Sequence, residues 1–193
     1  MHKGRLEAFS DGVIAIIITV MVLELKVPLG ETLADLQPLL PVFLSYVLSF
    51  VFVGIYWNNH HHMLQAAHHV SGGVLWANMH MLFWLSLTPA VNHWMGETHF
   101  APAPVALYGV VLFGTAIAYY ILARLLVRLH GEQSPLARAI GNDTKGRFSL
   151  VVYATAVPLA LFAPVAACLL YTAVAVIWLV PDRRIERVLA HCA

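Results

Sequence analysis

Histidines are the residues of this chain whose chemistry is most conspicuous. The sequence has eleven, and five of them fall within the segment HHHMLQAAHH, at positions 60–62 and 68–69. Imidazoles at such short spacing bind zinc or copper, which makes His60, His61 and His62 candidate metal ligands. No cysteine joins this segment. We therefore favour a solvated helix end with one or two hydrogen-bonded histidines, and we expect no resident metal or other cofactor.

A Ser-Asp pair stands directly before an apolar run, GVIAIIITVMVLEL. A carboxylate at the edge of a membrane span is costly unless it is paired, although Ser10 and Asp11 could also serve as a simple helix cap. Two later segments, GIYWNNHHHML and VLWANMHMLFW, supply polar side chains at the same predicted depth. We predict one interfacial hydrogen-bond network, drawn from Arg5, Ser10, Asp11, Trp57, Asn59, His60, His61 and Asn78.

The composition indicates that membrane helices position these groups. Hydrophobic residues make up 60% of the chain and charged residues only 11%, whereas about a quarter of a soluble domain is charged. The net charge of +1 argues against a nucleic-acid partner. A span needs about 20 apolar residues. We predict an all-α membrane protein, a single domain over residues 1–193, with six helices at about 7–26, 39–63, 72–95, 103–129, 147–163 and 165–181.

The lysines and arginines predict the orientation of these spans. With six helices, ten of the eleven basic residues fall on one side of the membrane, and positive charge marks the cytoplasmic side. Merging the last two spans across Pro164 would place the segment PDRRIER on the opposite side and spoil this pattern. We therefore expect both termini to be cytoplasmic.

The first predicted helix has one apolar stripe. At 100° per residue, five side chains fall within about 60° of one direction, and the Ser-Asp pair faces the opposite side. Spacing alone favours a buried packing seam for such a stripe, and an intramembrane threonine often bonds its own backbone. The other interpretation is that the stripe lines a passage. Its members are Gly12, Ile16, Thr19, Val20 and Leu23.

Three segments together resemble the transmembrane protein 175 family of potassium channels. RLEAFSDGVIAIIITVMVLELKVP is similar to the signature helix of that family, and IYWNNHHH and LWANMH…FWLSLTP are similar to the next two helices of its bacterial members. The later helices match by hydropathy only. The Phe-Ser-Asp motif is specific because it is followed by this apolar run and then by Trp and His on the second helix.

The resemblance implies a homotetramer in a bacterial inner membrane, with a central pore lined by the first helix. It implies a cation channel with modest selectivity for potassium over sodium, through which rubidium and caesium would also pass. Ile16, Val20 and Leu23 would form an apolar constriction, with Thr19 as a polar layer between them. Glu24 would lie with Gly12 at the pore mouths, and Phe9 would join the structural network around Asp11.

Two other classes of function stay open at this point. A secondary transporter usually needs broken helices, inverted repeats and a charged site at mid-membrane, and a histidine-linked metal-ion transporter would use the His60–His62 cluster. An enzyme is not expected, since Thr88, Asn92, His93 and Glu97 show no spacing typical of a nucleophile and its base.

Overall fold

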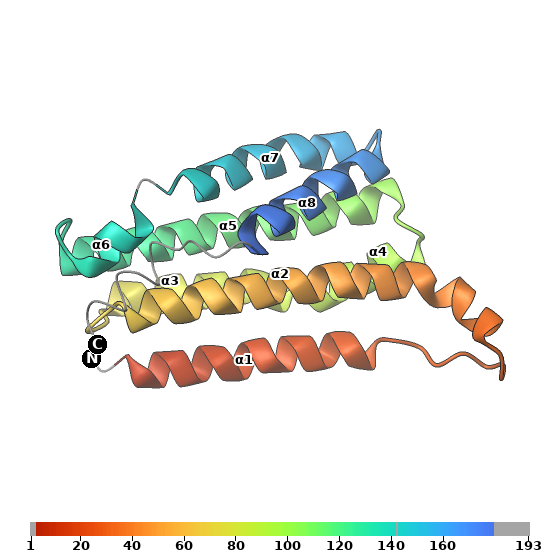
Figure 1. Ribbon diagram of the computed structural model, residues 1–193, viewed down its shortest axis with the longest axis horizontal. Helices are drawn as coiled ribbons and strands as arrows, with labels where there is room; N and C mark the ends of the chain where they lie inside the picture. Colours follow the sequence, from red (N-terminus) through yellow and green to blue (C-terminus); the bar gives the residue numbers. More distant parts are fainter. Residues whose placement is uncertain (1–2, 142, 180–193) are drawn as a thin grey trace.

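The computed structural model describes residues 3–141 and 143–179 of the 193-residue chain. Within these ranges all regular structure is helical, which confirms the predicted all-α class. The chain runs back and forth along one long axis (Figure 1). The elements are α1 (Gly4–Leu23), the 3₁₀ helix η1 (Leu33–Leu39), α2 (Leu40–Gln65), α3 (Gly72–Ser86), α4 (Thr88–Glu97), α5 (Pro102–His130), α6 (Pro135–Ile140), α7 (Thr144–Ala160) and α8 (Pro164–Leu179).

Four helical stretches in the described ranges are long and apolar enough to cross a membrane. They are α1, η1 with α2, α3 with α4, and α5. Helices α7 and α8 have 17 and 16 residues, which is shorter than the roughly 20 residues that a span requires. The count of six spans therefore stays a prediction.

The predicted helix 72–95 is two helices in the structure. Pro89 stands in the first turn of α4 and has no N–H group, so it cannot bond the carbonyl four residues earlier and interrupts the helix near Leu87. The two pieces still form one apolar stretch of 26 residues, Gly72–Glu97.

Other boundaries also differ from the predicted ranges. Helix α1 begins and ends three residues earlier than predicted, and α7 is displaced in the same direction. Inside the predicted loop between the fourth and fifth spans, Ser134 caps the short helix α6 by accepting a hydrogen bond from the N–H of Ala137 at 3.1 Å. The end of the predicted helix 165–181 and the C-terminus, which we predicted to be cytoplasmic, lie outside the described residues.

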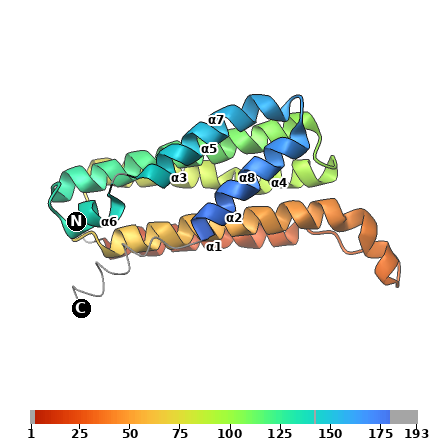
Figure 2. The ribbon, with the colours of Figure 1, turned by 45° about the horizontal axis from the view of Figure 1, so that its top comes forward.

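Helix α1 lies at one edge of the bundle and packs against α2, α3 and α4 (Figures 1 and 2). Helix α5 contacts both α3 and α7, and α8 runs obliquely over the bundle in Figure 2. The start of α1, the α2–α3 loop and α6 gather at one end of the molecule, while η1 and the α4–α5 and α7–α8 turns lie at the other. Because α1 is at the edge, only part of its circumference can be buried by its own chain.

Candidate functional site

Helix α1 has a buried face and an exposed face. The exposed fractions are 63% for Ile16, 39% for Val20 and 77% for Leu23, all large apolar side chains. Gly12 and Thr19 are exposed on the same side. A face of this kind needs lipid or another protein surface to cover it. The opposite face packs into the bundle through Leu6, Ser10, Ile14, Ile17 and Met21.

Thr19 supplies the hydroxyl group of the exposed stripe. Its Oγ1 donates a hydrogen bond to the carbonyl of Ala15 at 2.8 Å. Since the hydroxyl hydrogen is used within the helix, the oxygen has lone pairs left for another donor or a cation. Gly12 lies on the same face, one helical turn before Ile16. The space beside it is empty, because a Cβ atom added at Gly12 would meet nothing within 4 Å.

On the buried side, one polar chain ties three helices together. The hydroxyl of Ser10 donates to the carbonyl of Leu6 at 2.8 Å and accepts a hydrogen bond from Nδ2 of Asn78 at 2.9 Å. Oδ1 of Asn78 lies 2.7 Å from Nε2 of His60, which therefore acts as the donor. Ser10, Asn78 and His60 are completely buried. Helices α1, α3 and α2 are thus held in one register.

A second set of contacts joins α1 to α2 nearer the surface. The indole N–H of Trp57 donates to Oδ1 of Asp11 at 2.9 Å, and the indole stacks on the ring of His61 with centroids 5.8 Å apart. Nδ1 of His61 lies 3.1 Å from Oε1 of Glu7. The structure thus brings Asp11 to Trp57 and His61 to Glu7, a carboxylate that the sequence interpretation did not include.

Lys3 extends this row of contacts at the start of α1. Its ammonium group donates to the carbonyl oxygens of Leu64 and Gln65, both at 2.8 Å. Position 3, just before α1, and positions 7 and 11 of α1 therefore meet positions 65, 61 and 57 of α2, and each step is four residues in both segments. This shared spacing in two antiparallel helices is a signal by which Lys3 and Glu7 could have been found.

Three other predicted site residues lie elsewhere. Arg5 and Phe9 are exposed, on the same face of α1 as Ile16 rather than on the face of Ser10. Asn59 turns away from α1 and donates to the carbonyl of Ile55 in its own helix at 2.8 Å. Among the described residues, no group of three His, Cys, Asp or Glu side chains is placed to hold a metal ion, including the cluster around His62.

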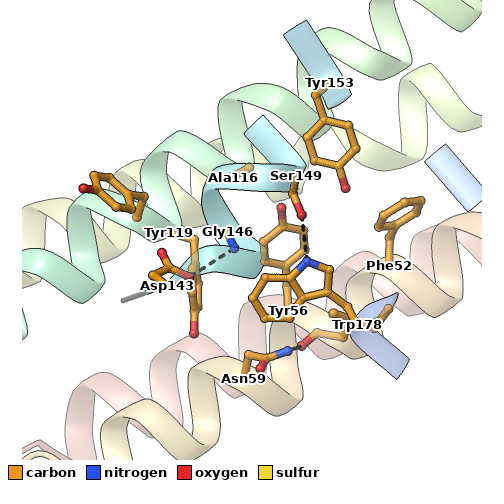
Figure 3. A pocket seen from close by; sticks show the side chains of 12 residues that line it. Phe52, Tyr56, Asn59, Ala116, Tyr119, Asp143, Gly146, Ser149, Tyr153 and Trp178 are labelled. Carbon is orange, nitrogen blue, oxygen red and sulfur yellow. Dashed lines mark hydrogen bonds between the residues drawn. The ribbon is translucent and has the colours of Figure 1, made fainter. Parts of the chain in front are cut away.

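Asn59 lines a small cavity between α2, α5, α7 and α8 (Figure 3). The cavity measures about 30 Å³ and has mainly aromatic walls, including Tyr56, Tyr119 and Trp178. Asp143 lies at its edge, where burial raises the pKa of the carboxyl group and the N–H of Gly146 lowers it. A cavity of this size holds one or two water molecules, so it is not a passage through the protein.

Glu24 does not share the direction of the exposed stripe. One of its carboxylate oxygens is buried and has no hydrogen-bond partner among the described residues. Burial raises the pKa of Glu24, and the nearby His93 of α4 lowers it. The side chain therefore faces its own bundle, whereas the neighbouring Leu23 is 77% exposed.

Comparisons with known proteins place these features in a family. The family described as the endosomal/lysosomal potassium channel TMEM175 matches residues 5–89, which include the exposed stripe and the buried Ser10–Asn78–His60 chain. A potassium channel of Chryseobacterium sp. strain P1-3 is 55% identical over 187 residues, 97% of each chain. The chain belongs to the TMEM175 family.

Two further proteins are similar to this TMEM175-family chain over most of its length. A potassium channel of Streptomyces collinus is 32% identical over 77% of each chain. The crystal structure of a lysosomal potassium-selective channel TMEM175 homolog from Chamaesiphon minutus superposes with a TM-score of 0.78 at 25% identity, and the match covers 91% of this chain and 95% of that one. The sequence-based assignment to the family is therefore confirmed, and the resemblance reaches beyond the first three helices.

Proposed function

We propose that this protein is a potassium channel of a bacterial plasma membrane. Its bacterial relatives are named potassium channels, and the strongest similarity covers nearly the whole chain. The structural observation that carries the proposal is the apolar stripe of α1, which its own chain leaves uncovered at Ile16, Val20 and Leu23. We take the chain as a single channel domain that crosses the membrane six times, with both ends in the cytoplasm.

In this proposal four copies assemble with the exposed faces of α1 around a central axis. Lipid tails are as apolar as leucine, so burial of apolar side chains alone gives little force for such an assembly, and other contacts between subunits are needed. Arg5 and Phe9 would supply such contacts near the cytoplasmic end, because both lie on the exposed face of α1 and would meet neighbouring subunits there. The contacts of Ser10 and Asp11 would fix the rotation of each α1 about its own axis.

The conduction path would narrow at rings of Ile16, Val20 and Leu23. An apolar ring controls permeation by excluding water when it is narrow, and it passes an ion that has shed part of its hydration shell when it is wider. Potassium loses hydration water more readily than sodium, so such rings favour potassium. The selectivity is modest because the apolar rings offer the ion no strong ligand in place of the water that it loses. Rubidium and caesium, which are hydrated still more weakly, would also pass.

Thr19 would add a ring of oxygen ligands between these apolar layers. Its hydroxyl hydrogen is engaged by Ala15, so the oxygen would present its lone pairs to a passing cation. Replacing Thr19 with alanine should lower the potassium-to-sodium permeability ratio while current persists. The reversal potential under bi-ionic conditions measures this ratio, and an unchanged value would remove Thr19 from selectivity.

A transporter is the less favoured alternative. Coupled transport usually relies on charged groups at mid-membrane, whereas the buried polar chain here consists of Ser10, Asn78 and His60. Transport of a metal ion by the histidine cluster finds no support in the described residues, where no three potential ligands converge.

Reconstitution in a potassium gradient tests the proposal. The purified protein in a planar bilayer should carry passive current that reverses near the potassium equilibrium potential, and a subunit count in parallel should give four. Saturable flux coupled to a second ion would support a transporter instead.

The variant Ile16→Asn tests the role of the stripe. A polar ring binds water, so this variant should conduct more than the wild type and discriminate less between cations. Ile121→Asn is the matched control, since Ile121 is an exposed isoleucine on α5 and should leave conduction unchanged. Equal currents for Ile16→Asn and the wild type would contradict the pore-lining assignment.

A further inference from the structure

The segment that joins α1 to α2 encloses an apolar hollow against the start of α2. The hollow has a volume of about 390 Å³, and among its described wall residues only Lys26 is charged. An apolar cavity of about 150 Å³ is large enough to hold a benzene ring, so this one has room for a longer hydrocarbon. We call it the α1–α2 hollow. Its walls include Leu25, Lys26, Leu36, Leu39, Leu40 and Phe43.

The α1–α2 hollow lies at the end of a helical stretch that is longer than a membrane span needs. Together, η1 and α2 form an apolar stretch of 33 residues, Leu33–Gln65. A helix of that length measures about 50 Å, whereas the hydrocarbon core of a bilayer is about 30 Å thick. Figure 1 shows η1, in orange, projecting beyond the neighbouring helices at this end. We therefore expect the hollow at the level where the hydrocarbon meets the lipid headgroups.

An ion pair stands at the rim of the hollow. Nζ of Lys26 lies 2.9 Å from Oε2 of Glu97, the last residue of α4, and the two side chains are 58% and 35% exposed. An ammonium group has three N–H donors and a carboxylate has two oxygens. The contact between Lys26 and Glu97 therefore leaves each group able to bind a ligand as well.

Close packing of α4 on α2 fixes Glu97 beside the hollow. A Cβ atom at Gly96 would lie 2.7 Å from both Oγ of Ser45 and Cα of Val42, so only glycine permits this approach. Val42 also lines the hollow. The charged rim and the apolar walls therefore belong to one site.

Carboxylates outnumber cations at this end of the described structure. The charged side chains of the α1–α2 connection and the end of α4 are Glu24, Lys26, Glu31, Asp35 and Glu97. An anionic headgroup would meet one ammonium group and an excess of negative charge, and a second copy of the chain would bring the same excess. A headgroup with both a phosphate and a primary ammonium group has the charges that complement the Lys26–Glu97 pair.

We propose that the α1–α2 hollow binds a phospholipid of the ethanolamine class. One acyl chain occupies the hollow, the phosphate contacts Lys26 and the ammonium group contacts Glu97. Lipid tails are as apolar as leucine, so the acyl chain gains little over the bilayer, and selectivity comes from the headgroup. The lipid site depends on the position of the chain in a membrane and not on ion conduction, so it stands or fails separately from the channel function.

Native mass spectrometry of the intact purified protein, titrated with phosphatidylethanolamine or phosphatidylglycerol, tests the headgroup preference. Contacts between partly exposed charges are weak, so we expect the ethanolamine lipid to bind about threefold more tightly than the glycerol lipid. Equal affinity for the two lipids, or tighter binding of phosphatidylglycerol, would overturn the proposed headgroup contacts.

The variant Leu36→Trp tests whether the hollow itself holds the lipid. The larger side chain fills the hollow, so most of the bound phosphatidylethanolamine should be lost. Leu33→Trp is the matched control, because Leu33 belongs to the same helix, is 86% exposed and is not a wall residue; it should bind lipid as the wild type does. Equal binding by the two variants would overturn the site. If Leu36→Trp lowered the number of subunits per assembly instead, the hollow would be a contact between copies and not a lipid site.

The variants Glu97→Gln and Lys26→Met test the two halves of the rim. Glu97→Gln removes the contact for the lipid ammonium group and frees Lys26 for a phosphate, so the preference should shift from phosphatidylethanolamine to phosphatidylglycerol. Lys26→Met should weaken the binding of both lipids. A folding defect would also weaken both, so only the altered charge explains a reversed preference. An unchanged preference for phosphatidylethanolamine in Glu97→Gln would show that Glu97 does not select the headgroup and would overturn the proposal.

Discussion

Replacing Asn78 with alanine should destabilise the protein more than any other single polar truncation on α3. Asn78 is fully buried and links Ser10 of α1 to His60 of α2 through bonds of 2.9 and 2.7 Å. Nδ1 of His60 has no partner among the described residues. The substitution would therefore leave both nitrogens of a buried imidazole unpaired.

The expected loss follows from these contacts. Each lost side-chain hydrogen bond costs about 0.6–1.5 kcal/mol, and a buried ring left without partners costs about 1–3 kcal/mol more. The two bonds and the ring together give about 2–6 kcal/mol. We use a value of about 3 kcal/mol, in the lower half of this range, because the Ser10 hydroxyl keeps its own bond to the carbonyl of Leu6. For a chain of this length each kcal/mol lowers the melting temperature by about 2–4 °C, so the apparent Tm should fall by about 6–12 °C.

Thermal unfolding of the purified protein in detergent, followed by circular dichroism at one scan rate, measures this shift. Asn59→Ala is the matched control, because Asn59 is partly buried and its hydrogen bond within the described part of the chain goes to a carbonyl of its own helix. It should lower Tm by no more than about 3 °C. If Asn78→Ala melted with the control or above it, the buried Ser10–Asn78–His60 chain would not be what holds α1 in register.

Two further predictions concern the surfaces on either side of this chain. Trp57→Phe keeps a ring that can stack on His61 but removes the hydrogen bond to Asp11, so unfolding in the same assay should become easier by about 1 kcal/mol; no change would mean that water satisfies Asp11 equally well. Gly96→Ala forces α4 away from α2 and should cost about 1–3 kcal/mol, whereas Gly54→Ala, where a Cβ meets nothing within 4 Å, should be nearly neutral by the same measurement.

The sequence was sufficient to predict the helical class and the family. The long apolar stretches could be read from hydropathy, because a membrane span is defined by length and composition. The motif around Ser10 and Asp11 carried the family assignment, and the match over residues 5–89 includes that motif.

The contacts of individual side chains were harder to predict. Glu7 and Lys3 were missed because a helical wheel gives the direction of a side chain but not the partner helix, which depends on the antiparallel register of α1 and α2. Asn59 was placed in the network by its depth alone, yet it bonds within its own helix. Pro89 was present in the sequence, but its effect on the span 72–95 is local and does not alter hydropathy.

Glu24 illustrates a further limit of such reasoning. Its position on the wheel lies between the exposed and buried faces of α1, so the choice between a pore mouth and the bundle depends on what α4 offers. The structure provides His93 there, and one oxygen of Glu24 is buried. No pattern within the first helix contains that information.

The central claim is that the exposed stripe of α1 lines the path of the ion. Modification of Ile16→Cys by a charged thiol reagent, in a chain whose own two cysteines have been replaced, tests it most directly during a potassium current recording. The reagent should block the current of Ile16→Cys, while the same reagent on Ile121→Cys should leave the current unchanged. Full current after complete modification at position 16 would mean that the stripe does not line the path of the ion.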